Sequence, residues 1–201
     1  MIGLFPSLKM GRMVAFESLI EQDYLYVLDY EAAVTAFEEQ PITIEYVWEG
    51  ALRKYTPDFL VRRKESCELV ECKPATLVPK EENQRKFAAA IDWCKPKGWS
   101  FAIVTDRDLR HGPRLANIKL LTQYARLGIT SETVHWVEDC LVGANNPLTL
   151  QEGGQILYPH IPAQGISILL YLAFHHRIGI TLDDQPICGS SLIWKKEAPL
   201  P

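Results

Sequence analysis

The first part of the chain shows apolar patterns typical of amphipathic helices. Apolar residues recur at spacings of three and four over residues 14–28, 80–94 and 113–127, which places them on one side of a helix. Gly98 follows the second segment closely and Gly128 follows the third, and a glycine commonly ends a helix. The pattern therefore predicts a helix in each segment, with one buried face.

Strands are predicted between and after the first two of these helices. Residues 41–50 alternate apolar and polar positions, which is typical of a half-buried strand. Residues 53–62 and 67–73 are two further extended segments separated by the polar stretch 63–66, and residues 99–105 form a continuous apolar run. The predicted order is α-β-β-β-α-β-α, an α/β fold in which helices flank a mixed sheet.

Beyond residue 128 the pattern changes to short elements. The predicted elements are a helix over 134–142 capped by Ser131, a loop rich in glycine, asparagine and proline over 143–162, an apolar helix over 165–176, and extended segments near 178–182 and 192–194. They indicate a small helical domain with a two-stranded wing. We therefore expect a first domain over residues 1–128 and a C-terminal domain over residues 129–201.

The composition is that of an ordinary globular protein, with 47% hydrophobic and 23% charged residues. The longest strongly apolar stretch, residues 166–174, is far shorter than the roughly 20 residues that cross a bilayer, and the first residues do not read as a secretory signal. We therefore expect a soluble cytoplasmic protein that does not contact a membrane. The cysteines form no Cys-x-x-Cys pair, so we expect reduced thiols rather than a zinc site or disulfides.

Charge is distributed unevenly along the chain. The net charge is −4, but residues 53–127 hold 16 Lys and Arg against 9 Asp and Glu, a local excess of +7. Such a segment suits a phosphate backbone, because counterion release depends on local clusters rather than on the whole-chain charge. A solvated surface is the simpler explanation for the same clusters. The candidate DNA-binding residues are Arg53, Lys54, Lys86, Arg107, Arg110 and Arg114.

The sharpest motif consists of Pro57-Asp58 and Glu71-Cys72-Lys73, which a hairpin would bring together. If the polar stretch between the two strands is a four-residue loop, the numbers of facing positions add to 129, so Asp58 opposes Glu71. The strand period of two places Glu71 and Lys73 on one face and Cys72 on the other. A loop of odd length would disperse the acidic and basic groups.

This grouping points to metal-assisted chemistry on phosphodiesters. Two adjacent carboxylates repel each other, which favours a hard divalent cation between them. Lys73 supplies a positive charge that orients a water nucleophile or stabilises a pentavalent phosphate, and one or two Mg²⁺ ions complete the requirements of cleavage. The pattern is the PD-(D/E)xK motif of nucleases. The simpler alternative is an exposed Asp–Lys–Glu group worth roughly a few tenths of a kcal/mol to the hairpin.

A fourth acidic group is predicted on the first helix. Glu21 shares a helix face with Tyr24, Leu25 and Leu28, so it borders the buried side, where an idle carboxylate is costly to desolvate. Glu17, one turn earlier on the same face, is the competing candidate. A boundary carboxylate paired with a basic neighbour is the alternative interpretation of Glu21.

These residues together resemble the TnsA endonucleases of heteromeric bacterial transposons, over roughly residues 14–127. The resemblance rests on Ser18-Leu19-Ile20-Glu21, Glu39-Gln40-Pro41, Arg53-Lys54-Tyr55-Thr56-Pro57-Asp58-Phe59-Leu60-Val61, Leu69-Val70-Glu71-Cys72-Lys73-Pro74, Lys86-Phe87 with Ala90, Trp93-Cys94, and Val104-Thr105-Asp106 with Arg110 and Asn117. The apolar helix that ends near residues 174–176, with Leu182 and Pro186 after it, is similar to the family's C-terminal domain.

The resemblance implies a restriction-endonuclease-like fold and an enzyme that cuts the 5′ ends of a transposon. A TnsB-type DDE transposase would cut the 3′ ends and join them to target DNA. The family's catalytic roles map onto Glu21, Asp58, Glu71 and Lys73. Mg²⁺, or Mn²⁺ in its place, would be held by the three acids and the backbone carbonyl of Cys72.

The resemblance also implies the partners of the C-terminal domain. That domain would be a winged-helix-like module that contacts a TnsC-type AAA+ regulator, the transposase or transposon-end DNA. The protein would work in the bacterial cytoplasm, at the nucleoid during transposition.

Two alternatives to this function stay open. A free-standing restriction or repair endonuclease of the same fold would cleave DNA without a transposase. A non-catalytic assembly subunit would bridge the transposase and the regulator, and it would have no need of repelling carboxylates beside a lysine.

Overall fold

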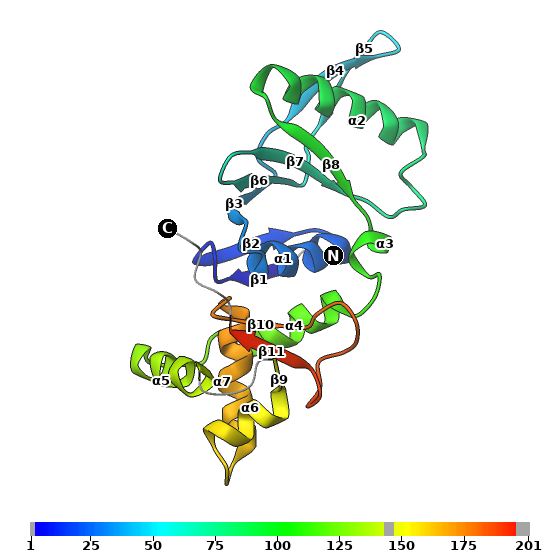
Figure 1. The fold of residues 1–201 in the computed structure, drawn as a ribbon. Coiled ribbons are helices and arrows are strands. Elements are labelled where there is room, and N and C mark those ends of the chain that lie inside the picture. The colour runs from blue at the N-terminus through cyan, green and yellow to red at the C-terminus, as the bar shows by residue number, and fades with distance from the viewer. Residues whose placement is uncertain (1–2, 143–146, 196–201) are drawn as a thin grey trace. The chain divides into compact units, whose positions relative to one another are not determined.

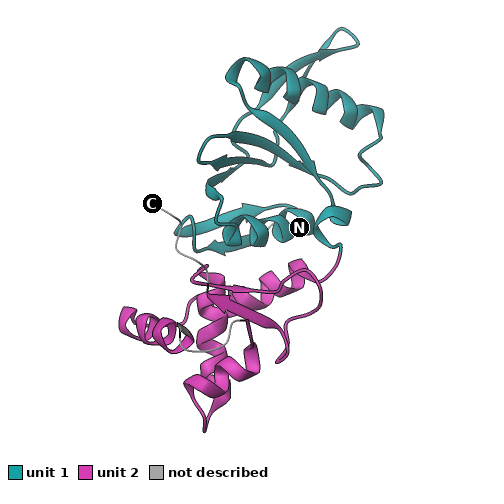
Figure 2. Cartoon of the chain, in the orientation of Figure 1, with its two compact units in different colours: residues 1–111 teal, residues 112–201 magenta. Residues whose placement is uncertain are grey.

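The computed structural model describes residues 3–142 and 147–195, which divide into two compact units (Figure 2). The first unit ends at His111 and the second begins at Gly112.

The first unit is built around a mixed sheet with the strand order β3-β6-β7-β8. Its strands are β3 (Val34–Glu39), β6 (Phe59–Arg63), β7 (Cys67–Cys72) and β8 (Ser100–Val104). β3 and β7 run antiparallel to β6, whereas β8 runs parallel to β7 after a crossover through α2 (Glu81–Cys94) (Figure 1). A parallel neighbour requires such a crossover. The α/β class with a mixed sheet is therefore confirmed.

The β6–β7 hairpin has the register predicted from the length of its loop. Leu60 faces Leu69, and the N–H of Arg63 closes the turn by donating to the carbonyl of Ser66 at 2.8 Å. The numbers of facing positions therefore add to 129. A slip by one residue would move the buried leucines to the other face of the sheet, which is why the register is well specified.

The two faces of the sheet are covered by different helices. α1 (Leu19–Tyr30) packs on the face that holds Phe59 and Val61, and α2 packs on the face that holds Leu60 and Leu69 (Figure 1). Successive side chains of β6 point to opposite helices, as the strand period of two requires. Because both faces are buried, packing fixes the ends of β6 and β7, where the candidate site lies.

The first predicted helix begins later than the sequence pattern indicated. β2 (Arg12–Phe16) pairs antiparallel with β1 (Gly3–Ser7), and α1 starts only after it. Val14 and Phe16 are buried at a spacing of two, which is the strand period. The hydroxyl of Ser18 then caps the first turn of α1, so the helix begins at its cap and not within the apolar run.

The extended segment predicted over residues 53–62 is not one strand. β4 (Ile44–Trp48) and β5 (Ala51–Tyr55) form an antiparallel ribbon, and the chain leaves it before β6 begins. The break falls at Pro57, which has no N–H to donate to a strand ladder. The strands β1, β2 and β3 and the short helix α3 (Asp106–Leu109) were also not predicted, so the order of elements differs from α-β-β-β-α-β-α by these insertions.

The second unit combines helices with a small antiparallel sheet. Its helices are α4 (Arg114–Tyr124), α5 (Ser131–Val142), α6 (Leu150–Leu157) and α7 (Pro162–Phe174), and its strands are β9 (Leu148–Thr149), β10 (Ile178–Ile180) and β11 (Leu192–Lys195). β11 lies between β9 and β10. The extended segments predicted for a wing therefore pair as β10 and β11, and β9 adds to them.

The division between the units differs from the boundary expected after residue 128. α4 belongs to the second unit, because the side-chain amide of Asn117 donates to the carbonyl of Leu182 at 2.8 Å and accepts from the N–H of Ile187 at 2.8 Å. A buried amide satisfied in this way ties the helix to the segment that follows β10.

The loop predicted over residues 143–162 is wrong over residues 150–157, where α6 lies, and residues 143–146 are outside the described residues. The glycines that suggested a loop instead allow close helix packing: a Cβ on Gly165 of α7 would lie 2.6 Å from the carbonyl oxygen of Gly154 of α6. Within the described residues, no single helix is long and apolar enough to cross a membrane, and α6 and α7 pass that test only together, as a pair bent by 116°.

Candidate functional site

Asp58 lies just before β6 and reaches across to the end of β7. Its Oδ2 accepts a hydrogen bond from the backbone N–H of Cys72 at 2.7 Å. Cys72 directly follows Glu71, so Asp58 lies beside the acid that the hairpin register predicted as its neighbour. The contact joins the two arms of the hairpin at the site.

Glu71 and Lys73 form an ion pair at the end of β7. The Nζ of Lys73 lies 2.6 Å from Oε1 of Glu71, and the Glu71 side chain is only 4% exposed. The backbone N–H of Lys73 donates to the carbonyl of Val104 in β8 at 2.9 Å, which fixes the chain beyond the strand. Glu71 and Lys73 share a face, as predicted, whereas Cys72 packs into the core on the α1 side.

Tyr55 binds the other oxygen of Glu71, and sequence reasoning gave it no role. Its hydroxyl donates to Oε2 of Glu71 at 2.7 Å. Tyr55 ends β5 and is buried in a cluster with Ile44 and Leu60. The sequence offered one sign of this role, an aromatic residue two positions before Pro57. Because residues 53–62 were predicted as one strand, Tyr55 was placed inside that strand and not at the end of a separate ribbon.

Glu21, not Glu17, is the buried acid at the start of α1. Glu21 is 9% exposed, whereas Glu17 is an exposed residue. The Oε2 of Glu21 accepts from the backbone N–H of Glu17 at 2.7 Å, so the carboxylate turns back toward the helix N-terminus, where negative charge is favourable. Both acids line a cavity of about 70 Å³ that Asp58 and Gln40 also line.

Burial and neighbouring charges shift the pKa values of Asp58 and Lys73. Burial, and then the charges of Glu71 and Glu21, raise the pKa of Asp58 to about 8 against the opposing effects of the Cys72 N–H and Lys73. Burial alone would lower the pKa of Lys73, but its hydrogen bond with Glu71 and the surrounding negative charges outweigh burial and raise it. A firmly charged lysine thus lies beside acids that repel one another, a combination that is common at functional sites.

The donor atoms at this site suit a hard divalent cation. Mg²⁺ and Ca²⁺ prefer oxygen ligands, and the site offers the carboxylates of Asp58, Glu71 and Glu21 with the backbone carbonyl of Cys72. A cation would also relieve the repulsion that helps to raise the pKa of Asp58. The Cys72 thiol is unsuited to this role, because burial raises its pKa and keeps it protonated.

The acids alone do not, however, make a complete set of metal ligands. In the part of the chain that the structure describes, no group of three or more His, Cys, Asp or Glu side chains is arranged to hold a metal ion. Tyr55 and Lys73 contact the two oxygens of Glu71. The residues therefore fit a cation by chemistry and by nearness, and backbone oxygens or water would have to complete the ligands.

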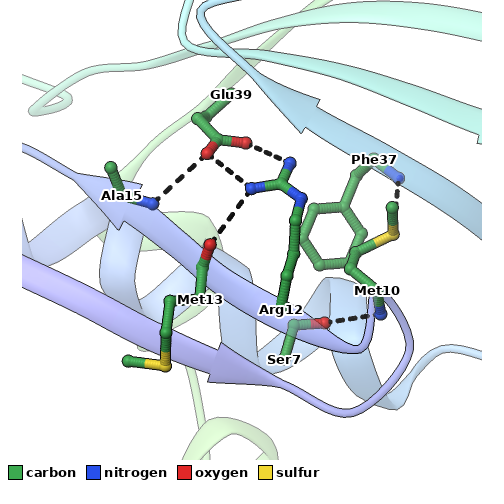
Figure 3. Close-up of polar contacts among 7 residues, drawn as sticks. All are labelled: Ser7, Met10, Arg12, Met13, Ala15, Phe37 and Glu39. Atoms are coloured by element: carbon green, nitrogen blue, oxygen red, sulfur yellow. Dashed lines mark hydrogen bonds and ion pairs between the residues drawn. The ribbon is translucent and has the colours of Figure 1, made fainter.

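A polar contact fastens β2 to β3 beside the cavity (Figure 3). The guanidinium of Arg12 donates to both oxygens of Glu39, at 2.7 and 2.6 Å, and the N–H of Ala15 donates to Glu39 at 3.5 Å. The hydrogen bond from Arg12 lowers the pKa of Glu39, which therefore stays charged. Glu39 and Ala15 line the cavity, so this contact supports its wall.

The candidate DNA-binding residues of the first unit lie on different elements. Arg53 and Lys54 are exposed on β5, and Lys54 pairs with Glu45 at 3.1 Å. The remaining positions in this unit are Lys86 on α2, which pairs with Glu82, Arg107, which is exposed on α3, and Arg110, which binds the buried Asp23 of α1 at 2.8 Å.

Arg114 belongs to the second unit, where it pairs with Asp183 at 3.1 Å. Of the candidates Arg107, Arg110 and Arg114, which are close in sequence, the first two therefore belong to the first unit and the last to the second. Arg110 and Arg114 each form an ion pair within their own unit, and this structural role is sufficient to explain both residues.

Residues 31–106 match the family model of the TnsA-like endonuclease N-terminal domain. The chain contains a TnsA-like endonuclease domain. The match runs from the end of α1 to the start of α3, so it includes Asp58, Glu71 and Lys73 and leaves Glu21 outside. A comparison with curated proteins finds no match. The resemblance drawn from the sequence is confirmed over residues 31–106, and the TnsA-like domain supports a nuclease role in transposition.

Proposed function

We propose that this protein is a metal-dependent DNA endonuclease that cuts the 5′ ends of a transposon while a TnsB-type DDE transposase cuts the 3′ ends. The main observation behind the proposal is that the β6–β7 hairpin brings Asp58 together with Glu71 and Lys73. Asp58 binds the backbone next to Glu71, and Lys73 pairs with Glu71. The match to a TnsA-like endonuclease domain over the same residues supports it.

Asp58, Glu71 and the carbonyl of Cys72 would hold Mg²⁺, with Mn²⁺ as a substitute, and Glu21 would add a carboxylate from α1. When bound, the ion supplies a Lewis acid for the phosphoryl oxygen and lowers the pKa of a coordinated water. Each carboxylate oxygen carries two lone pairs, so Oε1 of Glu71 can serve Lys73 and a cation together.

Lys73 would act by charge and by hydrogen bonding. Its raised pKa keeps the ammonium protonated at neutral pH, which suits a donor and not a base. From its position beside Glu71 it would hold the attacking water in place or stabilise the negative charge that develops on the phosphate.

The DNA would follow cations of the first unit. We assign Arg53, Lys54, Lys86 and Arg107 to contacts with the phosphate backbone of transposon-end DNA, because each lies on the first unit with the candidate site. Arg110 would first have to give up its ion pair with the buried Asp23, and Arg114 lies in the second unit, so their contribution would be smaller. The pairs of Lys54 with Glu45 and of Lys86 with Glu82 involve more exposed acids and are weaker competitors.

The second unit would be a winged-helix-like module that contacts partner proteins. Support comes from the order α5-β9-α6-α7-β10-β11 with β11 between its neighbours. The second unit also exposes large apolar side chains, among them Trp136, Ile156 and Ile161, which suits a protein surface better than a phosphate backbone. The partners would be the transposase and a TnsC-type AAA+ regulator, in the bacterial cytoplasm and at the nucleoid during transposition.

End cleavage of transposon DNA with transposase and Mg²⁺ tests the function. We expect Asp58→Ala and Lys73→Ala to abolish 5′ cleavage while 3′ cleavage and complex formation survive. Glu65→Ala and Lys64→Ala change the same types of residue in the exposed turn of the same hairpin, and they should cleave normally. Retained 5′ cleavage by either site variant would contradict the assignment.

The same assay separates the alternatives. Robust cleavage by the purified protein without transposase would favour a free-standing endonuclease. Loss of 3′ cleavage whenever the protein is omitted, together with normal activity of both site variants, would favour an assembly subunit.

A further inference from the structure

Tyr55 reaches the candidate site from outside the main sheet. It is the last residue of β5, it is 6% exposed, and its partner in the ribbon is Ile44. Its hydroxyl nevertheless donates to Oε2 of Glu71, a residue of β7, at 2.7 Å. The phenol thus connects the β4–β5 ribbon to the acid that the proposed function places on the cation.

The ribbon is held in a fixed place, which makes this contact specific. The hydroxyls of Thr43 and Thr56 hydrogen-bond across its base at 2.9 Å. Farther out, the guanidinium of Arg85 on α2 lies 4.3 Å from the ring centre of Trp48, a cation–π contact. The Tyr55 side chain therefore has little freedom to follow Glu71 if that carboxylate turns.

Glu71 is held between two donors. Lys73 contacts Oε1 and Tyr55 contacts Oε2, so each oxygen is assigned to one neighbour. Removal of the phenolic hydroxyl would leave Oε2 without this donor in a buried place, and the carboxylate would turn to find another. Groups that hold a metal-binding side chain in orientation commonly matter almost as much as the ligand itself.

We propose that Tyr55 is a positioning residue that holds Glu71 with Oε1 directed to Lys73 and to the cation. This role rests on the proposed nuclease function. Tyr55 acts through Glu71 and takes no part in bond breaking. Of the β4–β5 ribbon, it is Tyr55 that makes this contact with Glu71.

The test compares Tyr55→Phe with Tyr46→Phe in the full chain. Tyr46 lies on the partner strand of the same ribbon and loses the same atom. Mn²⁺ binding is measured by calorimetry without DNA, and kcat for 5′ cleavage and the Kd for DNA are measured with transposase. We expect Tyr55→Phe to weaken Mn²⁺ binding and to lower kcat by about 10-fold or more, with an unchanged Kd for DNA.

A second replacement guards against a folding defect. Tyr55→Met fills much of the same space without a hydroxyl, and we expect the same losses from it. If a folded Tyr55→Phe or Tyr55→Met protein bound Mn²⁺ and cleaved DNA as well as Tyr46→Phe, the proposed role of Tyr55 would be wrong. The nuclease proposal itself would stand. A wild-type protein that neither binds Mn²⁺ nor cleaves DNA would overturn the nuclease proposal and this role together.

Discussion

The backbone N–H of Gln40 donates to the carbonyl oxygen of Asp58 at 2.8 Å. Gln40 makes this contact with a φ of 45°, in the left-handed region that favours glycine. Its side-chain amide donates to Glu17 at 3.1 Å, and the N–H of Glu17 binds Glu21. Gln40 therefore links the segment that carries Asp58 to the start of α1, and the strained backbone lies at the wall of the candidate site.

Replacement of Gln40 by glycine should separate stability from function. We expect Gln40→Gly to raise the free energy of unfolding by roughly 0.5 to 1 kcal/mol, because glycine adopts a positive φ without steric cost. Cleavage of 5′ ends should fall, because the link to Glu17 is lost. Urea unfolding and the transposon-end assay measure the two effects.

Glu49→Gly is the matched control for this strain. Glu49 has a φ of 51° in the turn of the β4–β5 ribbon. Its replacement should stabilise the protein similarly and leave cleavage unchanged. Equal cleavage by the two glycine variants would show that Gln40 plays no part in arranging the site.

The raised pKa of Asp58 makes the stability of the metal-free protein depend on pH. The folded protein holds a proton on Asp58 up to about pH 8, whereas the unfolded chain releases it near the ordinary value of 3.8. Between these values the folded state binds more protons, so stability falls as the pH rises. Asp58→Asn should flatten this dependence of the melting temperature in EDTA. The exposed control Asp92→Asn should retain it.

The affinity for a divalent cation should depend on pH in the opposite direction to this stability. Because the ion requires the ionised carboxylate, its binding releases the proton, and its affinity should rise with pH up to about 8. Calorimetry with Mn²⁺ at pH 6, 7 and 8 measures this. A pH-independent affinity would mean that Asp58 does not bind the ion.

The register of β6 and β7 could be predicted from the sequence because it depends on local features. A four-residue loop and a period of two fix which residues face each other, and Leu60 and Leu69 must both be buried. The neighbourhood of Asp58, Glu71 and Lys73 follows from that register alone.

Tyr55 and Gln40 could not be found in the same way. Their contacts depend on where the chain leaves one sheet and enters another, near Pro57 and after β3, and hydrophobic periodicity does not show such exits. The glycines of α6 led to the wrong prediction of a loop for a related reason. Gly154 is small because another helix packs against it, and a single sequence does not distinguish that from a turn.

Asp29 of α1 binds the turn of the β1–β2 hairpin, and its replacement should be strongly destabilising. Its buried carboxylate accepts from the hydroxyl of Ser7 and from the backbone N–H groups of Leu8 and Lys9, the latter two at 3.0 Å. We expect Asp29→Ala to lower the free energy of unfolding by about 3 kcal/mol, because these donors lose their partner. Asp92→Ala, at an exposed ion pair, should cost about 0.5 kcal/mol or less. Similar losses in urea unfolding would contradict this assignment.

Gly165→Ala should destabilise the second unit through one added methyl group. A Cβ at Gly165 would lie 2.6 Å from the carbonyl oxygen and 2.9 Å from the Cα of Gly154, and backbone atoms cannot move aside as a flexible side chain could. α6 and α7 would have to separate, at a cost of about 1 to 3 kcal/mol. Gly128→Ala adds the same methyl group where nothing lies within 4 Å, so it should leave stability nearly unchanged. Because helix propensity by itself favours alanine over glycine inside α7, a neutral or stabilising Gly165→Ala would mean that the two helices do not pack this closely.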